Sequence, residues 1–121
     1  MPKKSLIFNP RDIVIIEFPY SDYSGSKLRP VLVLSDSDFN KNQNDIIVCK
    51  ITSSNFNDKY QIVISNEDLE KGNLKLERSW IGTNYILTID KSLVSKKIAK
   101  ISKNKFEEVQ NSIKTIFSFQ R

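Results

Sequence analysis

The feature that most constrains the fold of this chain is the apolar run at residues 31–34, which follows a polar, glycine-containing segment and the pair Arg29-Pro30. An unbroken apolar run with β-branched residues, bounded by turn residues, is typical of a strand that is covered on both faces. Because proline cannot donate to a sheet ladder, we expect Pro30 at the first position of this strand or at a sheet edge. Arg29 would then lie at the mouth of the sheet, where it is our first candidate for a functional residue.

Other segments also predict short strands, at residues 13–18, 45–51, 60–64, 78–87 and 97–101. Residues 60–64 alternate in polarity, which indicates a half-exposed strand. Residues 19–28, 36–44 and 52–59 are polar and are predicted as loops, and residues 67–72 as a short turn closed by Gly72. Short strands separated by turns predict a mainly β fold, a small and partly open β-barrel.

One helix is predicted to follow the strands. Ser102 is a plausible N-cap, and the helix would carry an amphipathic apolar face made of Phe106, Val109, Ile113, Ile116 and Phe117. We expect this face to pack on the barrel or on a second subunit. At 121 residues, the chain is expected to form a single domain over residues 1–121, with residues 1–10 as a short N-terminal extension.

The composition limits which residue types could carry out catalysis or bind a metal. The chain has no histidine and only one cysteine, Cys49, so an intramolecular disulfide and a cysteine-based metal cluster are excluded. Any catalysis would have to use arginine, lysine, carboxylates or hydroxyls. Cys49 falls within a predicted strand and is expected to be a small buried apolar residue. We expect a cytoplasmic protein, because no run is long enough to span a membrane and the N-terminal apolar run is too short for a signal peptide.

The net charge of +5 and the isoelectric point near 9.3 favour an anionic partner such as nucleic acid. The charge is uneven, since residues 91–121 contain eight Lys or Arg and two Glu, whereas residues 1–90 contain eleven basic and twelve acidic residues. A run of five lysines could attract RNA phosphates, although such a run is more often a solvated face. These are Lys96, Lys97, Lys100, Lys103 and Lys105.

Three motifs in order resemble those of a known family. They are Asp12-Ile13-Val14, then Arg29-Pro30-Val31 with a hydrophobic strand ending at Ser35, and then Ile51-Thr52-Ser53, with 23 positions from Arg29 to Thr52. This pattern resembles the PemK/MazF toxins of type II toxin–antitoxin systems, and the resemblance extends from about Arg11 to the helix. It implies an SH3-like barrel, a homodimer and a metal-independent, sequence-selective endoribonuclease for single-stranded RNA that needs no cofactor. It also implies an antitoxin whose flexible acidic segment occupies the RNA groove.

By motif position, the resemblance implies that Arg29 and Thr52 are catalytic. RNA supplies its own nucleophile, the 2′-OH, so such an enzyme needs charge stabilisation and proton handling rather than a covalent residue. A guanidinium offers a planar fork of donors to phosphate oxygens, and a hydroxyl at a strand end could bond a phosphate oxygen or orient the 2′-OH. The expected products are a 2′,3′-cyclic phosphate and a 5′-OH.

Five residues around these two are candidates for substrate binding: Tyr20, Asp22, Tyr23, Lys27 and Ser53. Tyr20 and Tyr23 could stack on unpaired bases, or could equally line a dimer interface. Asp22 is the only carboxylate in a loop where many members of the family carry a glutamate.

Simpler interpretations of the two catalytic candidates remain open. Arg29 could form a surface ion pair with Asp22 or Glu17, and Thr52 could be a turn residue that bonds its own backbone. Two other functions also remain. One is a toxin on the same barrel that poisons DNA gyrase, although gyrase poisons end in an aromatic and small residues whereas this chain ends in Phe119-Gln120-Arg121. The other is a non-catalytic RNA- or peptide-binding barrel, which predicts salt-sensitive binding without strand scission.

Overall fold

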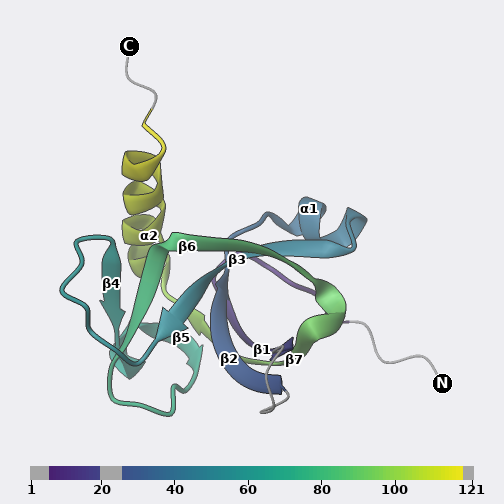
Figure 1. Cartoon of the computed structure of the whole chain (residues 1–121), viewed down its shortest axis with the longest axis horizontal. Helices are drawn as coiled ribbons and strands as arrows, with labels where there is room; N and C mark the ends of the chain where they lie inside the picture. The colour runs from purple at the N-terminus through teal and green to yellow at the C-terminus, as the bar shows by residue number, and fades with distance from the viewer. Residues whose placement is uncertain (1–5, 20–25, 119–121) are drawn as a thin grey trace.

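The structure is a computed structural model that describes residues 6–19 and 26–118 (Figure 1). Within these residues, strands β1 to β7 form one antiparallel sheet in the order β4-β6-β3-β2-β1-β7-β5, which curls into a half-barrel. Their bounds are Asp12–Pro19, Ser26–Val33, Asp45–Thr52, Gln61–Ile64, Leu69–Gly72, Ser79–Asp90 and Val94–Ile101. The helices are α1 (Ser37–Asn42) and α2 (Lys103–Ile116), with 3-10 turns at Asn66–Asp68 and Lys91–Leu93. The expected mainly β half-barrel with a C-terminal helix is confirmed.

The central strands are buried on both faces, as the apolar runs predicted. In β2, Val31, Leu32 and Val33 are all fully buried; Leu32 packs into one apolar cluster, whereas its two neighbours pack into another on the opposite face. Strand β3 divides in the same way, and the Cys49 side chain is buried in the first cluster. These two clusters hold the middle of the sheet rigid, so its strand ends can carry a site.

Strand β2 begins earlier than the sequence indicated. It starts at Ser26, so Pro30 lies inside the strand rather than at its first position, which leaves the second predicted place, a sheet edge. The ladder between β2 and β1 includes the pair Ile15 and Pro30, whereas the ladder to β3 begins only at Val31. At Pro30, therefore, β2 has a ladder neighbour on one side only, which is where a residue without an N–H is tolerated.

Two further elements were not foreseen. Residues 36–44, predicted as a loop, contain the short helix α1, whose N-cap Asp36 accepts the N–H of Asp38. Residues 69–72, predicted as part of a turn, form the edge strand β5 on β7. Gly72 ends β5 with φ +79°, in the left-handed region that glycine adopts readily. Both elements are short and polar, so neither has the apolar periodicity on which sequence prediction depends.

Helix α2 begins where it was predicted. The Oγ of Ser102 accepts the N–H of Lys105 at 3.1 Å and caps the helix. Phe106 and Val109 are buried in the first cluster, and the helix contacts β4 and β6, which confirms that its apolar face packs on the sheet. Phe117 lies just past the helix end and is exposed, so it is not part of that contact. Neither helix in the described part of the chain is long and apolar enough to cross a membrane.

Candidate active site

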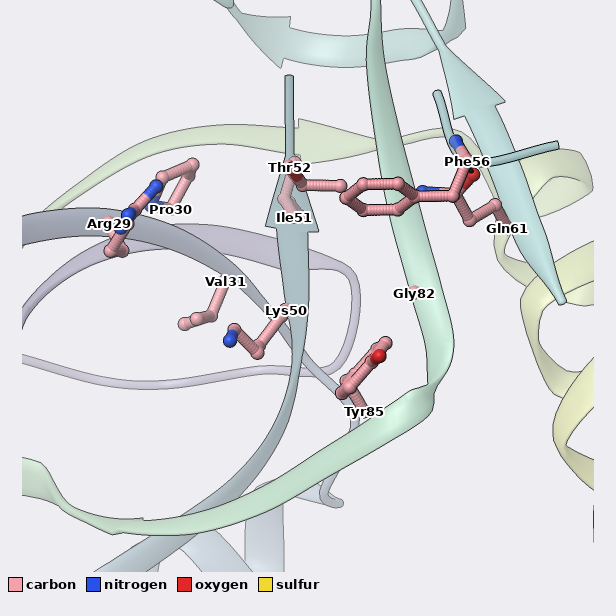
Figure 2. Close-up of a pocket in the computed structure, with 10 residues that line it drawn as sticks. All are labelled: Arg29, Pro30, Val31, Lys50, Ile51, Thr52, Phe56, Gln61, Gly82 and Tyr85. Atoms are coloured by element: carbon pink, nitrogen blue, oxygen red, sulfur yellow. Dashed lines mark hydrogen bonds between the residues drawn. The ribbon is translucent and has the colours of Figure 1, made fainter. Parts of the chain in front are cut away.

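A pocket of about 260 Å³ lies where β2 separates from β3, beside the ladder between β3 and β6, and Arg29 and Thr52 both line it (Figure 2). The position follows from the sheet register. Val31 pairs with Lys50 at the end of the β2–β3 ladder, and Arg29 on β2 and Thr52 on β3 each lie two residues from this last pair. Beyond that last pair the two strands separate and leave the space that forms the pocket. The structure thus brings together two residues that are 23 positions apart in the sequence.

Arg29 is half-buried on β2, where it pairs with Ile16 of β1. Within residues 6–19 and 26–118, no carboxylate forms an ion pair with Arg29, so the ion pair with Glu17 is not found. Asp22, the other suggested partner, lies outside the described residues, as do Tyr20 and Tyr23. In the described structure, the guanidinium is therefore available to an anionic ligand in the pocket.

Thr52 is the last residue of β3 and is half-buried. Its Oγ1 accepts the backbone N–H of Ser54 at 3.1 Å, so the turn role that the sequence left open is present in the structure. A hydroxyl that accepts one hydrogen bond still has its own hydrogen to donate. The turn therefore fixes the position of Oγ1 and leaves the Thr52 hydroxyl hydrogen free for a ligand.

The other two described substrate-binding candidates are not in this pocket. Lys27 and Ser53 are both exposed, and neither lines it. Lys27 lies two residues before Arg29 along β2, and Ser53 directly follows Thr52. Both are therefore close in sequence to a pocket residue without lining the pocket themselves.

Four side chains that line the pocket were missed by sequence reasoning: Lys50, Phe56, Gln61 and Tyr85. Lys50 could have been found, because it lies two residues before Thr52 on the same strand and therefore on the same face. The other three belong to a loop, an edge strand and a bulge, and their positions depend on contacts that sequence spacing does not show.

The loop after β3 is held in place by Gln61. The side-chain oxygen of Gln61 accepts the N–H of Phe56 at 2.8 Å, and its amide nitrogen donates to the carbonyl of Ser54 at 3.0 Å. The ring of Phe56 is 65% exposed and lies beside Thr52 at the pocket (Figure 2). An exposed aromatic side chain on an anchored loop is a surface that a flat ligand can contact.

The charges at the pocket favour an anion. Arg29 and Lys50 supply two cations, and the described lining contains no carboxylate. Among the described residues, no group of three or more His, Cys, Asp or Glu side chains is placed to hold a metal ion. The pocket thus combines two cations, a positioned hydroxyl and two aromatic rings, a set suited to a phosphate with a planar group attached.

The lysine run of the C-terminal third lies largely elsewhere. Lys97 and Lys100 approach the buried carboxylate of Asp12, at 3.2 and 3.7 Å, and line a second hollow of about 290 Å³ over β1, β5 and β7. Lys105 contacts Asp68 at 3.9 Å and Glu108 at 3.4 Å. Part of this run therefore neutralises carboxylates of the fold, which agrees with the simpler interpretation of a structural, solvated face.

The fold is that of toxins from toxin–antitoxin systems. It is similar to a MazE–MazF structure from Deinococcus radiodurans, with a TM-score of 0.78 and 16% identity over 96% of this chain and 100% of that one. It is also similar to an endoribonuclease in complex with its cognate antitoxin from a mycobacterial species, with a TM-score of 0.73 and 12% identity over 93% and 97% of the two chains. The Mycobacterium tuberculosis toxin MazF-mt6 gives a TM-score of 0.68 and 15% identity over 89% and 99%.

The sequence itself identifies the family. The family model described as PemK-like, MazF-like toxin of type II toxin–antitoxin system matches residues 9–117. The chain therefore belongs to the PemK/MazF-like toxin family, as its three motifs suggested. No protein in the curated set matches the sequence.

Proposed function

We propose that this protein is a toxin that cleaves single-stranded RNA, including mRNA, at selected sequences without a metal ion. The observation that carries the proposal is that Arg29 and Thr52 line one pocket whose described lining holds two cations and no carboxylate. The family match supports a toxin of a type II system, and two structures with the same fold are those of mycobacterial endoribonucleases. Such an enzyme would act in the cytoplasm, where its substrate is found.

In the proposed reaction, the 2′ oxygen attacks the adjacent phosphorus, a bond forms between them, and the bond from phosphorus to the 5′ oxygen breaks. One proton leaves the 2′-OH and one is added to the departing 5′ oxygen, so the products are a 2′,3′-cyclic phosphate and a 5′-OH. The Arg29 guanidinium would donate to the non-bridging oxygens, where negative charge accumulates. The Thr52 hydroxyl would donate to a phosphate oxygen or hold the 2′-OH, and Lys50 would add a second positive charge.

The proposal includes two protein partners. Structures of the same fold contain a MazE–MazF pair and an endoribonuclease with its cognate antitoxin, which supports an antitoxin as partner here. A flexible acidic antitoxin segment would complement Arg29 and Lys50 and would become ordered when it binds. The second partner is another copy of this chain, forming a homodimer.

The test is incubation of the protein with a long single-stranded RNA in excess EDTA, followed by mapping of the fragment ends. We expect discrete cuts with 5′-OH ends. Arg29→Ala should lower the cleavage rate by roughly 100- to 1000-fold, the usual cost of removing one preorganised donor to a developing charge. The cleavage rate of Arg29→Lys should lie between those of the wild type and Arg29→Ala, because lysine keeps the positive charge but lacks the planar fork of donors. Arg78→Ala is the matched control, since Arg78 is exposed and lies outside the pocket lining.

The outcomes separate the alternatives. Full cleavage by a folded Arg29→Ala protein would remove Arg29 from the mechanism. Salt-sensitive RNA binding by the wild type without any scission would indicate a non-catalytic binding barrel. If the RNA is neither bound nor cut, a gyrase supercoiling assay tests whether the protein acts on that enzyme instead.

A further inference from the structure

Strand β6 carries an unusual insertion beside the pocket. Its ladder with β3 steps from the pair of Cys49 with Ile86 directly to the pair of Lys50 with Gly82, so residues 83–85 have no counterpart on β3. Bulges of this kind bend a strand and turn side chains in a new direction, and they are common beside active sites. Here the bulge places Tyr85 at the edge of the pocket (Figure 2).

The bulge is anchored rather than loose. Thr83 is fully buried, and its Oγ1 donates to the carbonyl of Tyr60 at 2.8 Å and lies 2.6 Å from the Oγ of Ser112 on α2. The backbone N–H of Thr83 also donates to the Tyr60 carbonyl, at 3.0 Å. The backbone that carries Tyr85 is thus tied both to the segment before β4 and to the helix.

The ring of Tyr85 lies over Gly82. A Cβ at Gly82 would approach the Tyr85 Cδ2 to 3.0 Å, so the missing side chain provides the space in which the ring lies. The Tyr85 side chain is nevertheless 54% exposed. One side of the Tyr85 ring therefore lies against the backbone at Gly82, while much of its surface remains open to a ligand.

Lys50 lies next to this ring. Its Nζ is 5.5 Å from the ring centroid, near the outer limit of a cation–π contact, and it is carried on a flexible side chain. A lysine in this place can leave the ring and bind a phosphate while a flat group takes its place on the ring. Arg29 and Thr52 line the same pocket, so a nucleotide held at Lys50 and Tyr85 would lie beside the proposed reacting phosphate.

We propose that Tyr85 is a stacking platform for one unpaired base of the RNA, with Lys50 contacting a phosphate beside that base. This inference rests on the proposed function in taking RNA as the ligand, and it adds a substrate-positioning residue to the site. A paired base cannot offer its face to the ring, so the platform also gives a physical reason for a preference for single strands.

The test compares two probes of equal length and charge: a labelled 2′-O-methyl oligoadenylate and a fully abasic sugar–phosphate chain. Neither probe has a free 2′-OH for the proposed cleavage, so binding is measured apart from catalysis. Tyr85→Ala should weaken binding of the oligoadenylate by roughly 5- to 150-fold, the usual value of one stacked base, and leave the abasic chain unaffected. Tyr85→Phe keeps the ring and should bind like the wild type.

Two further variants complete the design. Lys50→Met should keep the preference for the base-bearing probe and lower the slope of log affinity against log salt by about 0.7, the value for one phosphate contact on a single strand. Phe39→Ala is the matched control for removal of an exposed aromatic residue, because Phe39 lies on α1 and not in the pocket lining. It should change the affinity for neither probe.

The platform is refuted if folded Tyr85→Ala lowers the affinity for both probes equally or changes the affinity for neither. It is also refuted if the wild type shows no preference for the base-bearing probe. An acidic peptide that binds at Tyr85 while the oligoadenylate does not would also refute it. The proposed function fails separately, when the wild type leaves long RNA uncut in EDTA. If Tyr85→Ala then still weakens binding of the oligoadenylate alone, Tyr85 stacks on a base in a protein that binds RNA without cutting it.

Discussion

Thr52 shows how one side chain can serve the fold and the site together. Its oxygen accepts the N–H of Ser54, which orders the turn after β3, and its hydrogen remains available at the pocket. A sequence argument alone favours the turn role, because threonine bonds its own backbone in many loops. The structure shows that the turn role does not exclude the catalytic one.

Thr52→Val tests whether cleavage needs the Thr52 hydroxyl. It keeps the shape of the side chain but removes both the acceptor for Ser54 and the donor for the ligand, so RNA cleavage should fall by roughly 100-fold or more. Thr52→Ser keeps the hydroxyl and should stay within a few-fold of the wild type. Initial cleavage rates measure this, with Thr88→Val as control, since Thr88 is exposed on β6 away from the pocket lining. Wild-type rates in Thr52→Val would limit Thr52 to the turn.

Arg29 and Thr52 could be predicted from the sequence because each lies at a fixed place in a motif, two residues from the last pair of the β2–β3 ladder, where both line the pocket. Tyr85 could not be predicted. It reaches the pocket only because the β6 ladder skips residues 83–85, and an insertion of this kind leaves no periodic trace in the sequence. Residues positioned by regular strands are thus accessible to sequence reasoning, and residues positioned by an irregularity are not.

At the scale of elements, the edge strand β5 depends on one glycine. Gly72 pairs with Ala99 of β7 at a positive φ, and it lies so close to β7 that a Cβ would come within 2.0 Å of the carbonyl oxygen of Ile98. That oxygen belongs to the backbone and cannot move aside as a side chain would. No other residue type fits here without displacing β5 from the sheet.

Gly72→Ala should therefore destabilise the protein. The left-handed conformation alone costs roughly 1–2 kcal/mol for a residue with a Cβ, and the clash adds to this, so we expect a loss of about 2 kcal/mol or more in the free energy of unfolding. Denaturant titration measures this loss, and hydrogen exchange should show the β5 and β7 amides losing protection first. Asn73→Ala is the control at the neighbouring exposed position. A loss below about 0.5 kcal/mol, typical of an ordinary surface change, would contradict the close approach.

The elements with a clear apolar or alternating pattern were predicted correctly, including the four-residue strand β4, whereas β5 and α1 were not. Strands β1, β3 and β6 and helix α2 carry strong apolar patterns, so their existence follows from the sequence even where their ends differ by a few residues. Strand β5 and helix α1 are stabilised by contacts with distant parts of the chain. The buried Asn40 of α1, for example, donates to the carbonyl of Phe8 from 32 residues away, and such a partner cannot be read from local sequence.

For the whole molecule, the two-faced core explains why the fold could be predicted in class but not in topology. Alternating burial in β2 and β3 requires cover on both sides, which the apolar runs already indicate. The order of strands, with β5 beside β7 and β4 beside β6, depends on long-range pairing for which the sequence contains no local sign. The apolar runs therefore predict the fold class, whereas long-range contacts determine the order of the strands.

The buried thiol of Cys49 makes the stability of the whole protein depend on pH. Burial raises the pKa of this thiol from 9.0 to about 12. Above pH 9 the unfolded chain releases a proton that the folded protein keeps, so the free energy of unfolding should fall as the pH rises, by up to about 1.4 kcal/mol per pH unit, until about pH 12. Below pH 9 this contribution to stability is fully present.

Denaturant unfolding at pH 8 and pH 10, under reducing conditions, tests this dependence. Wild type should lose about 1.4 kcal/mol more than Cys49→Ala between the two pH values. The variant is the appropriate reference because it keeps every lysine and tyrosine that also titrates in this range. Equal losses in the two proteins would show that the thiol ionises as readily in the folded state as in the unfolded chain.

Pro30 has a further consequence for the behaviour of this molecule in a crowded solution. On the N-terminal side of Val31, β2 no longer pairs with β3. The opening that forms the pocket therefore also exposes a strand edge in the middle of the sheet. Exposed edges attract strands of other chains and promote aggregation. A proline at this position removes one of the donors that an intruding strand would need. The site can therefore stay open to ligands recognised by side chains while resisting the backbone pairing that leads to insoluble protein.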